Sequence, residues 1–264
     1  MQELLVPLPP CEDDAPKTQM IQTRQLTKVF HDKKRGGVTA VDQVSFRCVP
    51  GKVFGLLGVN GAGKTTCLRV LATLLRPTSG SALVNGFDVQ RESHKVRASI
   101  GFLSAATALY GRLTAYEVVQ YFGRLHGMDD AVLRPRMEEL FTMLEMNEFR
   151  DRRCDKLSTG MKQKTSIART LVHDPPVMIF DEPTSGLDVL IARTVIGFIR
   201  QCGQRGKTVV FSTHVMSEAE KLCDTIAIIH GGCILAEGTL AELREQAGLA
   251  SLEDIFIKIV EEKS

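Results

Sequence analysis

Residues Gly58 to Thr66 read GVNGAGKTT and match the phosphate-loop pattern G-x-x-x-x-G-K-[ST]. The stretch follows the apolar run KVFGLL, so it is expected to join a buried strand to a helix that stops before Arg76-Pro77. Glycines let backbone N–H groups close around phosphate oxygens, where a Cβ would intrude. Lys64 can then reach the β- and γ-phosphates, and the hydroxyl of Thr65 can ligate Mg²⁺. The predicted ligands of a nucleoside triphosphate are Gly58, Asn60, Gly61, Ala62, Gly63, Lys64, Thr65 and Thr66.

A second motif, VMIFDEPTSGLD, spans residues 177–188. Its apolar residues predict a buried strand that carries Asp181 to the carboxyl edge of a sheet, where the carboxylate can support Mg²⁺. Glu182 follows at the place where a carboxylate can orient and deprotonate an attacking water. His214 ends another apolar strand, VVFSTH, so its side chain is expected to reach the γ-phosphate from the side. The predicted catalytic groups are Glu182, His214 and Lys64, and the predicted metal ligands are Thr65 and Asp181.

The stretch DKLSTGMKQK, from Asp155 to Lys164, has two interpretations. Ser158 and Thr159 are ordinary N-cap residues, because a side-chain hydroxyl accepts a hydrogen bond from an N–H of the first helical turn. The same helix N-terminus carries a partial positive charge, so it can also face a phosphate that is held by something else. Taken alone, the stretch predicts a capped helix.

Composition excludes several classes of protein. The chain has 264 residues and a net charge of +2, which gives no field strong enough to suggest nucleic acid as the main partner. Its seven cysteines include no C-x-x-C pair, which argues against a disulfide framework or a zinc site. A reduced, cytosolic compartment therefore fits best. No stretch reaches the roughly 18 apolar residues of a membrane span. Residues 1–19 contain acids and prolines and are expected to be a disordered leader.

The order of the patterns predicts the fold class. Residues 20–89 contain β-rich segments with an Asn-Gly turn signal, and residues from about 105 to 160 show helical apolar stripes. From Pro175 onward, buried strands alternate with helices, and a small amphipathic helix closes the chain. The prediction is an α/β fold with a parallel core sheet, an antiparallel β subdomain and a helical insertion. We expect one domain over residues 20–258 and a tail over residues 259–264.

The chain resembles the ATPase subunits of ATP-binding cassette (ABC) transporters over about Met20 to Lys258. The phosphate loop, LSTGMKQK, FDEPTSGLD and the histidine after a strand occur in the order that this family has. The resemblance implies a P-loop NTPase fold and a head-to-tail dimer in which Ser158 and Gly160 contact a γ-phosphate bound by the other subunit. It also implies that Asp188 lies at this interface and that Phe30 stacks on adenine.

The resemblance also implies cofactors, partners and location. ATP and Mg²⁺ are the expected cofactors, and the expected partners are a multispanning membrane permease and a second copy of the chain, with no nucleic acid. The subunit is expected to be cytoplasmic and peripheral at the inner face of the cell membrane. LYGRLTAYEVVQYFGRLHG resembles sodium-extrusion ATPase subunits and, more loosely, drug-export ATPases. The expected function is therefore ATP hydrolysis that energises export of a sodium ion, or of a drug or lipid.

Two segments depart from the family pattern. Thr159 and Met161 replace the Gly and Gln of the common Ser-Gly-Gly-Gln signature, whereas Ser158 and Gly160 remain. The segment IGFLSAATALY resembles the one that usually bears a Gln in contact with Mg²⁺ and water, but Ala105 stands at that place.

Two alternative functions remain at this stage. The chain could be a soluble ABC ATPase that acts on ribosomes or nucleic acid, although such proteins usually carry paired cassettes or long coiled-coil insertions. It could instead be a non-hydrolytic regulatory cassette. The missing Gln supports that second alternative, and the presence of Lys64, Asp181, Glu182 and His214 argues against it.

Overall fold

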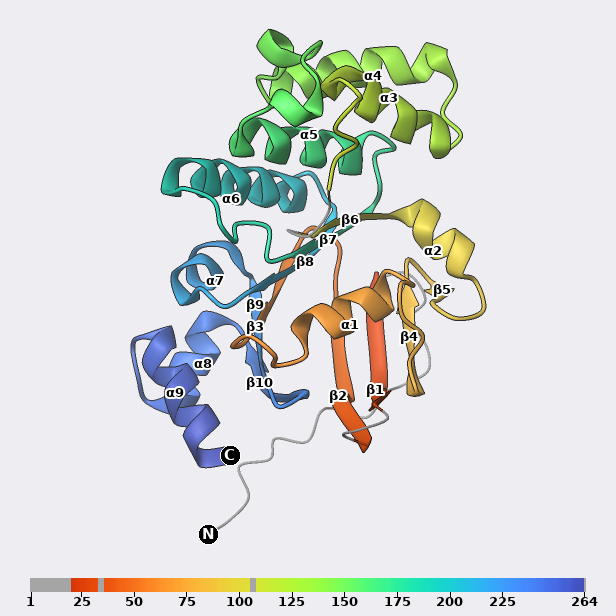
Figure 1. Cartoon of the computed structure of the whole chain (residues 1–264). Coiled ribbons are helices and arrows are strands. Elements are labelled where there is room, and N and C mark those ends of the chain that lie inside the picture. The colour runs from red at the N-terminus through yellow and green to blue at the C-terminus, as the bar shows by residue number, and fades with distance from the viewer. Residues whose placement is uncertain (1–19, 33–35, 105–107, 264) are drawn as a thin grey trace.

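The computed structural model describes residues 20–32, 36–104 and 108–263. The predicted leader over residues 1–19 and the departure at Ala105 lie outside the described residues. The described chain forms a six-stranded and a four-stranded sheet, with one helical layer above the larger sheet and a second group of helices at its side (Figure 1). This architecture confirms the predicted α/β class.

The six-stranded sheet has the order β10-β9-β3-β8-β7-β6 and is parallel except for β10, which is antiparallel to β9. Every residue of β3, β7 and β8 is buried, as expected for strands that are covered on both faces. The edge strand β6 is not among the strands predicted from the sequence. The strands are β3 (Val53–Leu57), β6 (Ile100–Ser104), β7 (Val177–Asp181), β8 (Thr208–Thr213), β9 (Thr225–His230) and β10 (Cys233–Gly238).

Successive residues of these strands face two different cores, because side chains alternate across a sheet. Val177 and Ile179 of β7 pack with helix α1 (Lys64–Leu71) and with the smaller sheet. Met178 and Phe180 pack on the other side, against the helical layer. The parallel sheet is therefore the central layer, and α1 lies between the two sheets.

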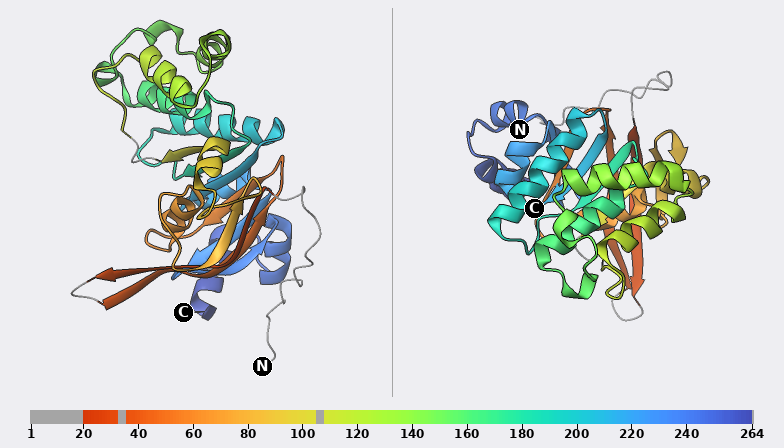
Figure 2. Two further views of the ribbon diagram at one scale, coloured as in Figure 1. Left: turned by 90° about the vertical axis from the view of Figure 1, so that its right-hand side faces the viewer. Right: turned by 90° about the horizontal axis from the view of Figure 1, so that it is seen from above.

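The smaller sheet is antiparallel, with the order β2-β1-β4-β5. Asn85 and Gly86 both have positive φ angles, of 52° and 80°, and form the predicted tight turn between its last two strands. Figure 2 shows that the first two strands extend beyond the body of the molecule as a long ribbon. The strands are β1 (Ile21–Asp32), β2 (Gly36–Cys48), β4 (Ser79–Val84) and β5 (Phe87–Asp88).

The predicted helical insertion forms the layer at the top of Figure 1. It contains α3 (Ala115–Leu125), α4 (Asp130–Met143) and the start of α5 (Thr159–Leu171), with 3₁₀ turns at Asn147–Phe149 and Cys154–Lys156. Helix α3 begins with a capping box: Thr114 accepts from the N–H of Glu117, whose carboxylate accepts from the N–H of Thr114. The buried apolar stripes of α3 and α4 join the core of the central sheet.

Three C-terminal helices, α7, α8 and α9, form a third small core with β9, whereas α6 packs in the core of the helical layer and the central sheet. The helices are α6 (Val189–Gln204), α7 (Met216–Leu222), α8 (Leu240–Ala247) and α9 (Leu252–Lys263), and α2 (Ser93–Ser99) lies earlier in the chain. Ile259 and Val260 pack against the core that α7 and α8 share with α9, so α9 continues through residues 259–263. The division of the chain into a domain over residues 20–258 and a tail over residues 259–264 stays a prediction.

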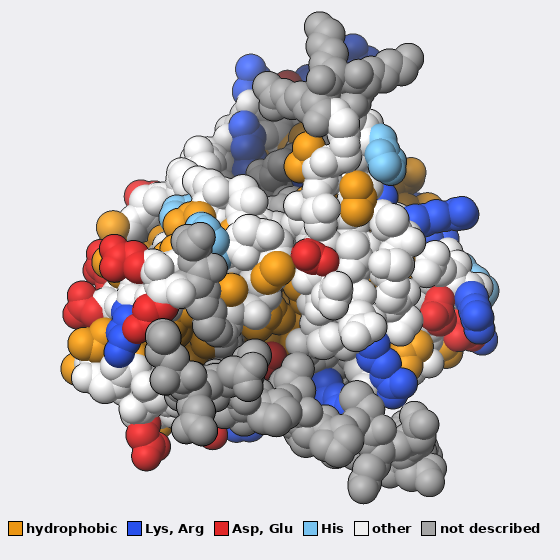
Figure 3. Space-filling view, turned by 90° about the horizontal axis from the view of Figure 1, so that it is seen from below, with side chains coloured by type: hydrophobic (Ala, Val, Ile, Leu, Met, Phe, Trp, Pro, Cys, Tyr) orange, Lys and Arg blue, Asp and Glu red, His pale blue; other side chains and the backbone are white. Residues whose placement is uncertain are grey.

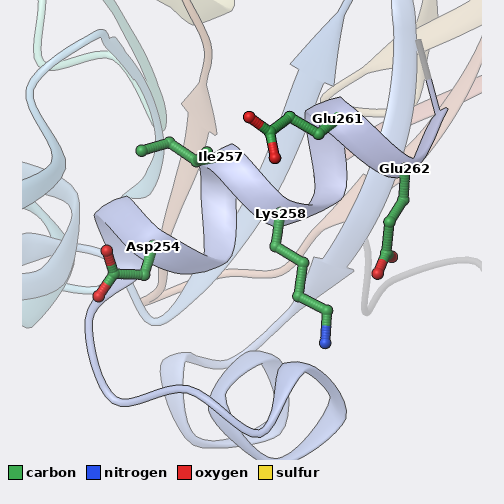
Figure 4. A pocket seen from close by; sticks show the side chains of 5 residues that line it. All are labelled: Asp254, Ile257, Lys258, Glu261 and Glu262. Atoms are coloured by element: carbon green, nitrogen blue, oxygen red, sulfur yellow. The ribbon is translucent and has the colours of Figure 1, made fainter.

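The outward face of α9 carries Asp254, Ile257, Lys258, Glu261 and Glu262 around a shallow hollow (Figure 4). All five come from one helix, and none is a predicted site residue. In the described ranges, no helix combines the length and the hydropathy that crossing a membrane requires.

A pair of stacked histidines joins the helical layer to the central sheet. The rings of His126, which caps α3, and His173, which follows α5, have centroids 3.6 Å apart and planes 3° apart. His173 Nε2 lies 3.0 Å from the carbonyl oxygen of Ile100 at the start of β6. Burial, together with His126 and Lys207, lowers the pKa of His173 to about 4, against about 6.5 in an unfolded chain.

This lowered pKa predicts a loss of stability in acid. Between pH 6.5 and 4, His173 binds a proton in the unfolded chain but not in the folded chain. Its contribution to the free energy of unfolding is therefore full above pH 6.5 and decreases by about 3 kcal/mol towards pH 4. Burial raises the pKa of Glu237 to about 7, so this carboxyl group binds a proton more readily in the folded chain. Its effect on stability is opposite to that of His173 over an overlapping range of pH, because it stabilises the folded chain as the pH falls. We therefore expect denaturant unfolding at pH 7 and pH 4.5 to show a smaller acid loss in His173→Gln than in the wild type. Glu237→Gln should lose more stability between pH 7 and pH 4.5 than the wild type does. An equal loss in all three proteins would contradict the roles given to His173 and Glu237.

Candidate active site

The loop Gly58–Thr66 joins the carboxyl end of β3 to the first turn of α1, as predicted. Gly63 has a φ of 106°, and a Cβ there would collide with the carbonyl oxygen of Ala40 in β2. Gly232 donates its N–H to the carbonyl of Ala62 at 3.0 Å and accepts from the N–H of Asp42 at 2.9 Å. The loop is therefore clamped between β2 and the β9–β10 turn, and Gly63 is the residue that permits the close approach.

The ammonium group of Lys64 is held from three sides. Its Nζ donates to the carbonyl oxygens of Gly58 at 2.7 Å and Val59 at 3.0 Å, and it lies 3.0 Å from a carboxylate oxygen of Glu182. The side chain is only 3% exposed. A cation in this setting interacts strongly with nearby anions, because little water screens it. Asn60 and Gly61 remain exposed at the tip of the loop, and Thr66 is half-buried on α1.

The two predicted metal ligands come together. The hydroxyl of Thr65, on α1, donates to Oδ1 of Asp181, at the end of β7, at 2.9 Å. The hydroxyl of Ser212, on the neighbouring strand β8, donates to the same oxygen at 2.9 Å. A hydroxyl and a carboxylate are oxygen donors of the kind that Mg²⁺ prefers, so the residues present fit this ion.

Glu182 and His214 also lie in one place. Glu182 has a φ of 47°, an unusual backbone conformation for a residue with a side chain, and such positions cluster at functional sites. Its N–H bonds to both the carbonyl oxygen and the hydroxyl of Ser212, at 3.2 and 3.1 Å. One of its carboxylate oxygens lies 3.0 Å from Lys64 Nζ, and the other lies 3.3 Å from Nδ1 of His214. The three predicted catalytic groups therefore form one connected cluster.

Two residues beside this cluster were not predicted from the sequence. Ser212 is paired in register with Asp181 across β7 and β8, and it holds both Asp181 and Glu182. Glu218 of α7 accepts hydrogen bonds from the hydroxyls of Thr213 at 2.8 Å and Thr184 at 3.1 Å, and these threonines lie next to His214 and close to Glu182 in the chain. Ser212 lies inside an apolar strand pattern, so only the register between the two strands identifies its role.

The LSTG stretch begins α5 as a capped helix, which is the first of its two interpretations. Ser158 is the N-cap, and its hydroxyl accepts the N–H of Met161 at 3.3 Å. A Cβ on Gly160 would collide with the side chain of Ile191 in α6, so the glycine lets the two helices approach. Figure 1 shows α5 in the helical layer and α1 below the central sheet. The structure therefore does not bring Ser158 and Gly160 to the phosphate loop of the same chain.

Asp188 and Phe30 have other partners in the chain. Asp188 is the N-cap of α6, and its Oδ1 accepts from the N–H groups of Leu190 and Ile191 at 3.0 Å each. Phe30 lies on the β1–β2 ribbon opposite Val38, and Lys28 Nζ lies 5.1 Å from its ring centroid. The predicted roles of both residues stay predictions. Ala105, which stands where the family usually has a Gln, lies outside the described part of the chain.

Comparison with known proteins agrees with this geometry. A family model described as ABC transporter matches residues 41–185. The chain belongs to the ABC transporter family. It is 42% identical over 239 residues to the ABC transporter ATP-binding protein NatA of Bacillus subtilis (strain 168), and the match covers 90% of this chain and 97% of that protein.

Two further similar proteins add detail. The Nod factor export ATP-binding protein I of Neorhizobium galegae is 37% identical over 238 residues, which cover 90% of this chain and 67% of that protein. A solved dimeric ATP-binding cassette, in a post-hydrolysis state bound to ADP and Pi, matches with a TM-score of 0.75 and 26% identity, covering 83% of this chain and 98% of that one. The ABC chain described here is thus an ATP-hydrolysing cassette.

Proposed function

We propose that this ABC ATPase hydrolyses Mg-ATP to energise export through a separate membrane permease. The observation that carries the proposal is the connected cluster of Lys64, Glu182 and His214 beside the Thr65–Asp181 pair, all at the carboxyl edge of the central sheet. Similarity to an ATPase of Nod factor export supports the direction of transport. The exported species, a sodium ion or a drug-like or lipid molecule, would be selected by the permease.

In this proposal each residue has one role in the reaction. Lys64 offsets the negative charge that develops on the phosphates, and its two carbonyl contacts fix its position before ATP binds. Thr65 and Asp181 would hold Mg²⁺, which supplies further neutralisation of the phosphate charge. Glu182 takes a proton from the attacking water as its oxygen bonds to the γ-phosphorus and the bond to ADP breaks. His214 orients the carboxylate of Glu182 from its second oxygen.

The second part of the proposal is a composite site in a head-to-tail dimer. The N-terminus of α5 carries the exposed Ser158 and a partial positive charge that suits a phosphate. Because α5 and α1 lie in different layers of the chain, the phosphate that Ser158 meets would be bound by a second copy (Figure 1). Gln163 of α5 donates to the carbonyl of Pro183 at 2.9 Å, which would connect this contact to the neighbouring Glu182. Asp188 and Phe30 would then lie at the interface and on the adenine.

The helical layer provides the surface that would meet the permease. Tyr110, Tyr121, Leu125 and Val132 are large apolar side chains, and each is about half or more exposed. The rings of Tyr110 and Tyr121 lie 6.0 Å apart and both contact Phe122. Exposed aromatic groups that gather in this way are typical of protein interfaces. This contact would place the subunit at the inner face of the membrane, in the cytoplasm.

The alternatives have less support. Figure 3 shows acidic, basic and apolar side chains together on the face seen from below, whereas a nucleic-acid partner calls for a face dominated by basic groups. A non-hydrolytic cassette does not need Glu182 to be held by Lys64, His214 and Ser212 in a strained conformation. The polar group absent at Ala105 can be replaced by waters, because Mg²⁺ commonly keeps several of them.

Mixing two inactive variants tests the composite site. Lys64→Ala disables the phosphate loop, and Ser158→Arg blocks the N-terminus of α5. In a mixed dimer one site carries both defects, while the other combines an intact phosphate loop with an intact α5. Because half of the dimers in an equal mixture are mixed, recovery of roughly a quarter of the wild-type ATPase rate is expected.

The control replaces the Ser158→Arg protein by a double variant, Lys64→Ala with Ser158→Arg, in the same mixture. Every phosphate loop is then disabled, so the rate should stay at the background. A site contained within one chain predicts no recovery in either mixture, and that result would contradict the head-to-tail arrangement.

A further inference from the structure

Arg169 is a buried cation near the end of α5 that none of the proposed catalytic steps uses. The residue is 6% exposed. Its Nη1 donates to the carbonyl oxygen of Ala108 at 3.3 Å, and its guanidinium lies 5.0 Å from the centroid of the Phe122 ring. Within the described ranges, Arg169 forms no ion pair with a carboxylate. Burial lowers the pKa of Arg169, which indicates that its charge is poorly solvated.

A buried charge without an ionic partner lowers the stability of a fold, whereas an apolar side chain of similar size does not. Arg150 offers a contrast on the same layer. Its guanidinium lies 4.8 Å from the ring of Tyr116, but it is also paired with Glu138 at 2.7 Å. Arg169 is therefore the cation whose position calls for an explanation other than stability.

The two contacts of Arg169 give that explanation. Ala108 lies two residues before Tyr110, and Phe122 contacts both Tyr110 and Tyr121. Arg169 thus supports the exposed aromatic surface from beneath. It belongs to α5, the helix that Ser158 caps, so one rigid helix connects this support to the N-terminus that would face a phosphate.

The backbone makes a second connection between the same two regions. The N–H of Cys154 donates to Leu113 at 2.8 Å, and the N–H of Asp155 donates to Gly111 at 3.0 Å. These bonds join the residues just before Ser158 to the residues just after Tyr110. The residues around Tyr110 are therefore attached to the end of α5 through Arg169 and to the 3₁₀ turn that precedes α5 through these backbone bonds.

We propose that Arg169 is a positioning residue that couples the aromatic surface to the nucleotide bound by the second copy, through α5. The inference rests on the proposed function, because it requires α5 to contact a phosphate across a head-to-tail dimer. Movement of α5 towards that phosphate shifts Arg169, and Arg169 carries Ala108 and Phe122 with it. The conformation of the surface that would meet the permease then depends on whether the nucleotide site of the second copy is occupied.

The three tyrosines of the chain make this testable without the permease. The sequence contains no tryptophan, and its tyrosines are Tyr110, Tyr116 and Tyr121, all in this region. The experiment uses the Glu182→Gln chain, labelled with 3-fluorotyrosine, and records fluorine NMR spectra with and without Mg-ATP. Sizing of the same samples measures the dimer. We expect the Tyr110 resonance to shift when the dimer forms.

Arg169→Met in this background should keep the dimer and lose most of the shift, and Arg169→Lys should restore part of it. The melting temperature should be unchanged or higher in Arg169→Met, because an unpaired buried charge is removed. Arg150→Met is the matched control, since it removes a cation over Tyr116, and it should leave the Tyr110 shift intact. A merely structural role predicts instead a lower melting temperature and a lost dimer.

The outcomes separate the two proposals. If the parent chain fails to dimerise with Mg-ATP, the composite site and the coupling through Arg169 are both overturned. If the dimer forms and the Tyr110 resonance does not move, or moves equally in Arg169→Met, the composite site stands and the coupling is overturned. A shift that depends on Arg169 and on the dimer supports the inference.

Discussion

Replacing Lys64 by alanine is expected to reduce ATP hydrolysis at least a thousandfold, which corresponds to about 4 kcal/mol of activation free energy. The ammonium group is almost completely buried and is fixed by the carbonyl oxygens of Gly58 and Val59. A fixed cation in a site with little water stabilises developing phosphate charge far more than a hydrated one does. Alanine removes the charge and leaves water in its place. The measurement is steady-state turnover of Mg-ATP by the purified chain.

Lys52→Ala is the matched control, because it also removes one lysine charge. The side chain of Lys52 is 57% exposed and pairs with Asp224 at 3.0 Å, away from the phosphate loop. Its loss should change turnover by less than about twofold, since exposed ion pairs contribute little. Retention of a tenth or more of the wild-type rate in Lys64→Ala would show that the phosphate loop is wrongly assigned.

Much of the fold follows from local patterns in the sequence. The buried strands β3, β7 and β8 are continuous apolar runs, and the turn at Asn85-Gly86 has residues that tolerate positive φ angles. The prediction missed β6, which has the same length as β3 and β7 but whose sequence, IGFLS, is interrupted by Gly101 and ends in a serine. Short apolar runs of this kind do not distinguish a strand from part of a helix, and pairing with β7 decides the outcome.

In the site, too, some residues follow from local motifs and others depend on contacts with distant strands. Lys64, Thr65, Asp181 and Glu182 were predicted because their motifs are contiguous in the sequence and each motif has a defined chemistry. Ser212 could not be predicted, because its contact with Asp181 depends on the register between β8 and β7. The strained backbone of Glu182 is likewise invisible in the sequence, since it results from contacts made by a distant strand. Long-range register therefore supplies what motifs lack.

Replacing Glu182 by glutamine is expected to lower turnover by roughly a hundredfold or more while ATP still binds. The amide has nearly the shape of the carboxylate, so its oxygen can still accept a hydrogen bond from Lys64 or His214. It cannot take a proton from water at neutral pH, so the chemical step slows. Because hydrolysis is the step that would release two copies joined by ATP, the variant should accumulate as a dimer. Size-exclusion chromatography with light scattering, with and without Mg-ATP, measures this directly.

Two variants decide whether such a dimer has the proposed arrangement. Glu237→Gln removes another partly buried carboxyl group, on β10, and should neither slow turnover appreciably nor trap a dimer. Adding Ser158→Arg to Glu182→Gln should abolish the ATP-dependent dimer, because the N-terminus of α5 then presents a bulky side chain where a phosphate must fit. ATP would still bind to each phosphate loop, as equilibrium dialysis can verify. A dimer that persists in the double variant must use another surface, and in that case Ser158 caps α5 without facing a phosphate.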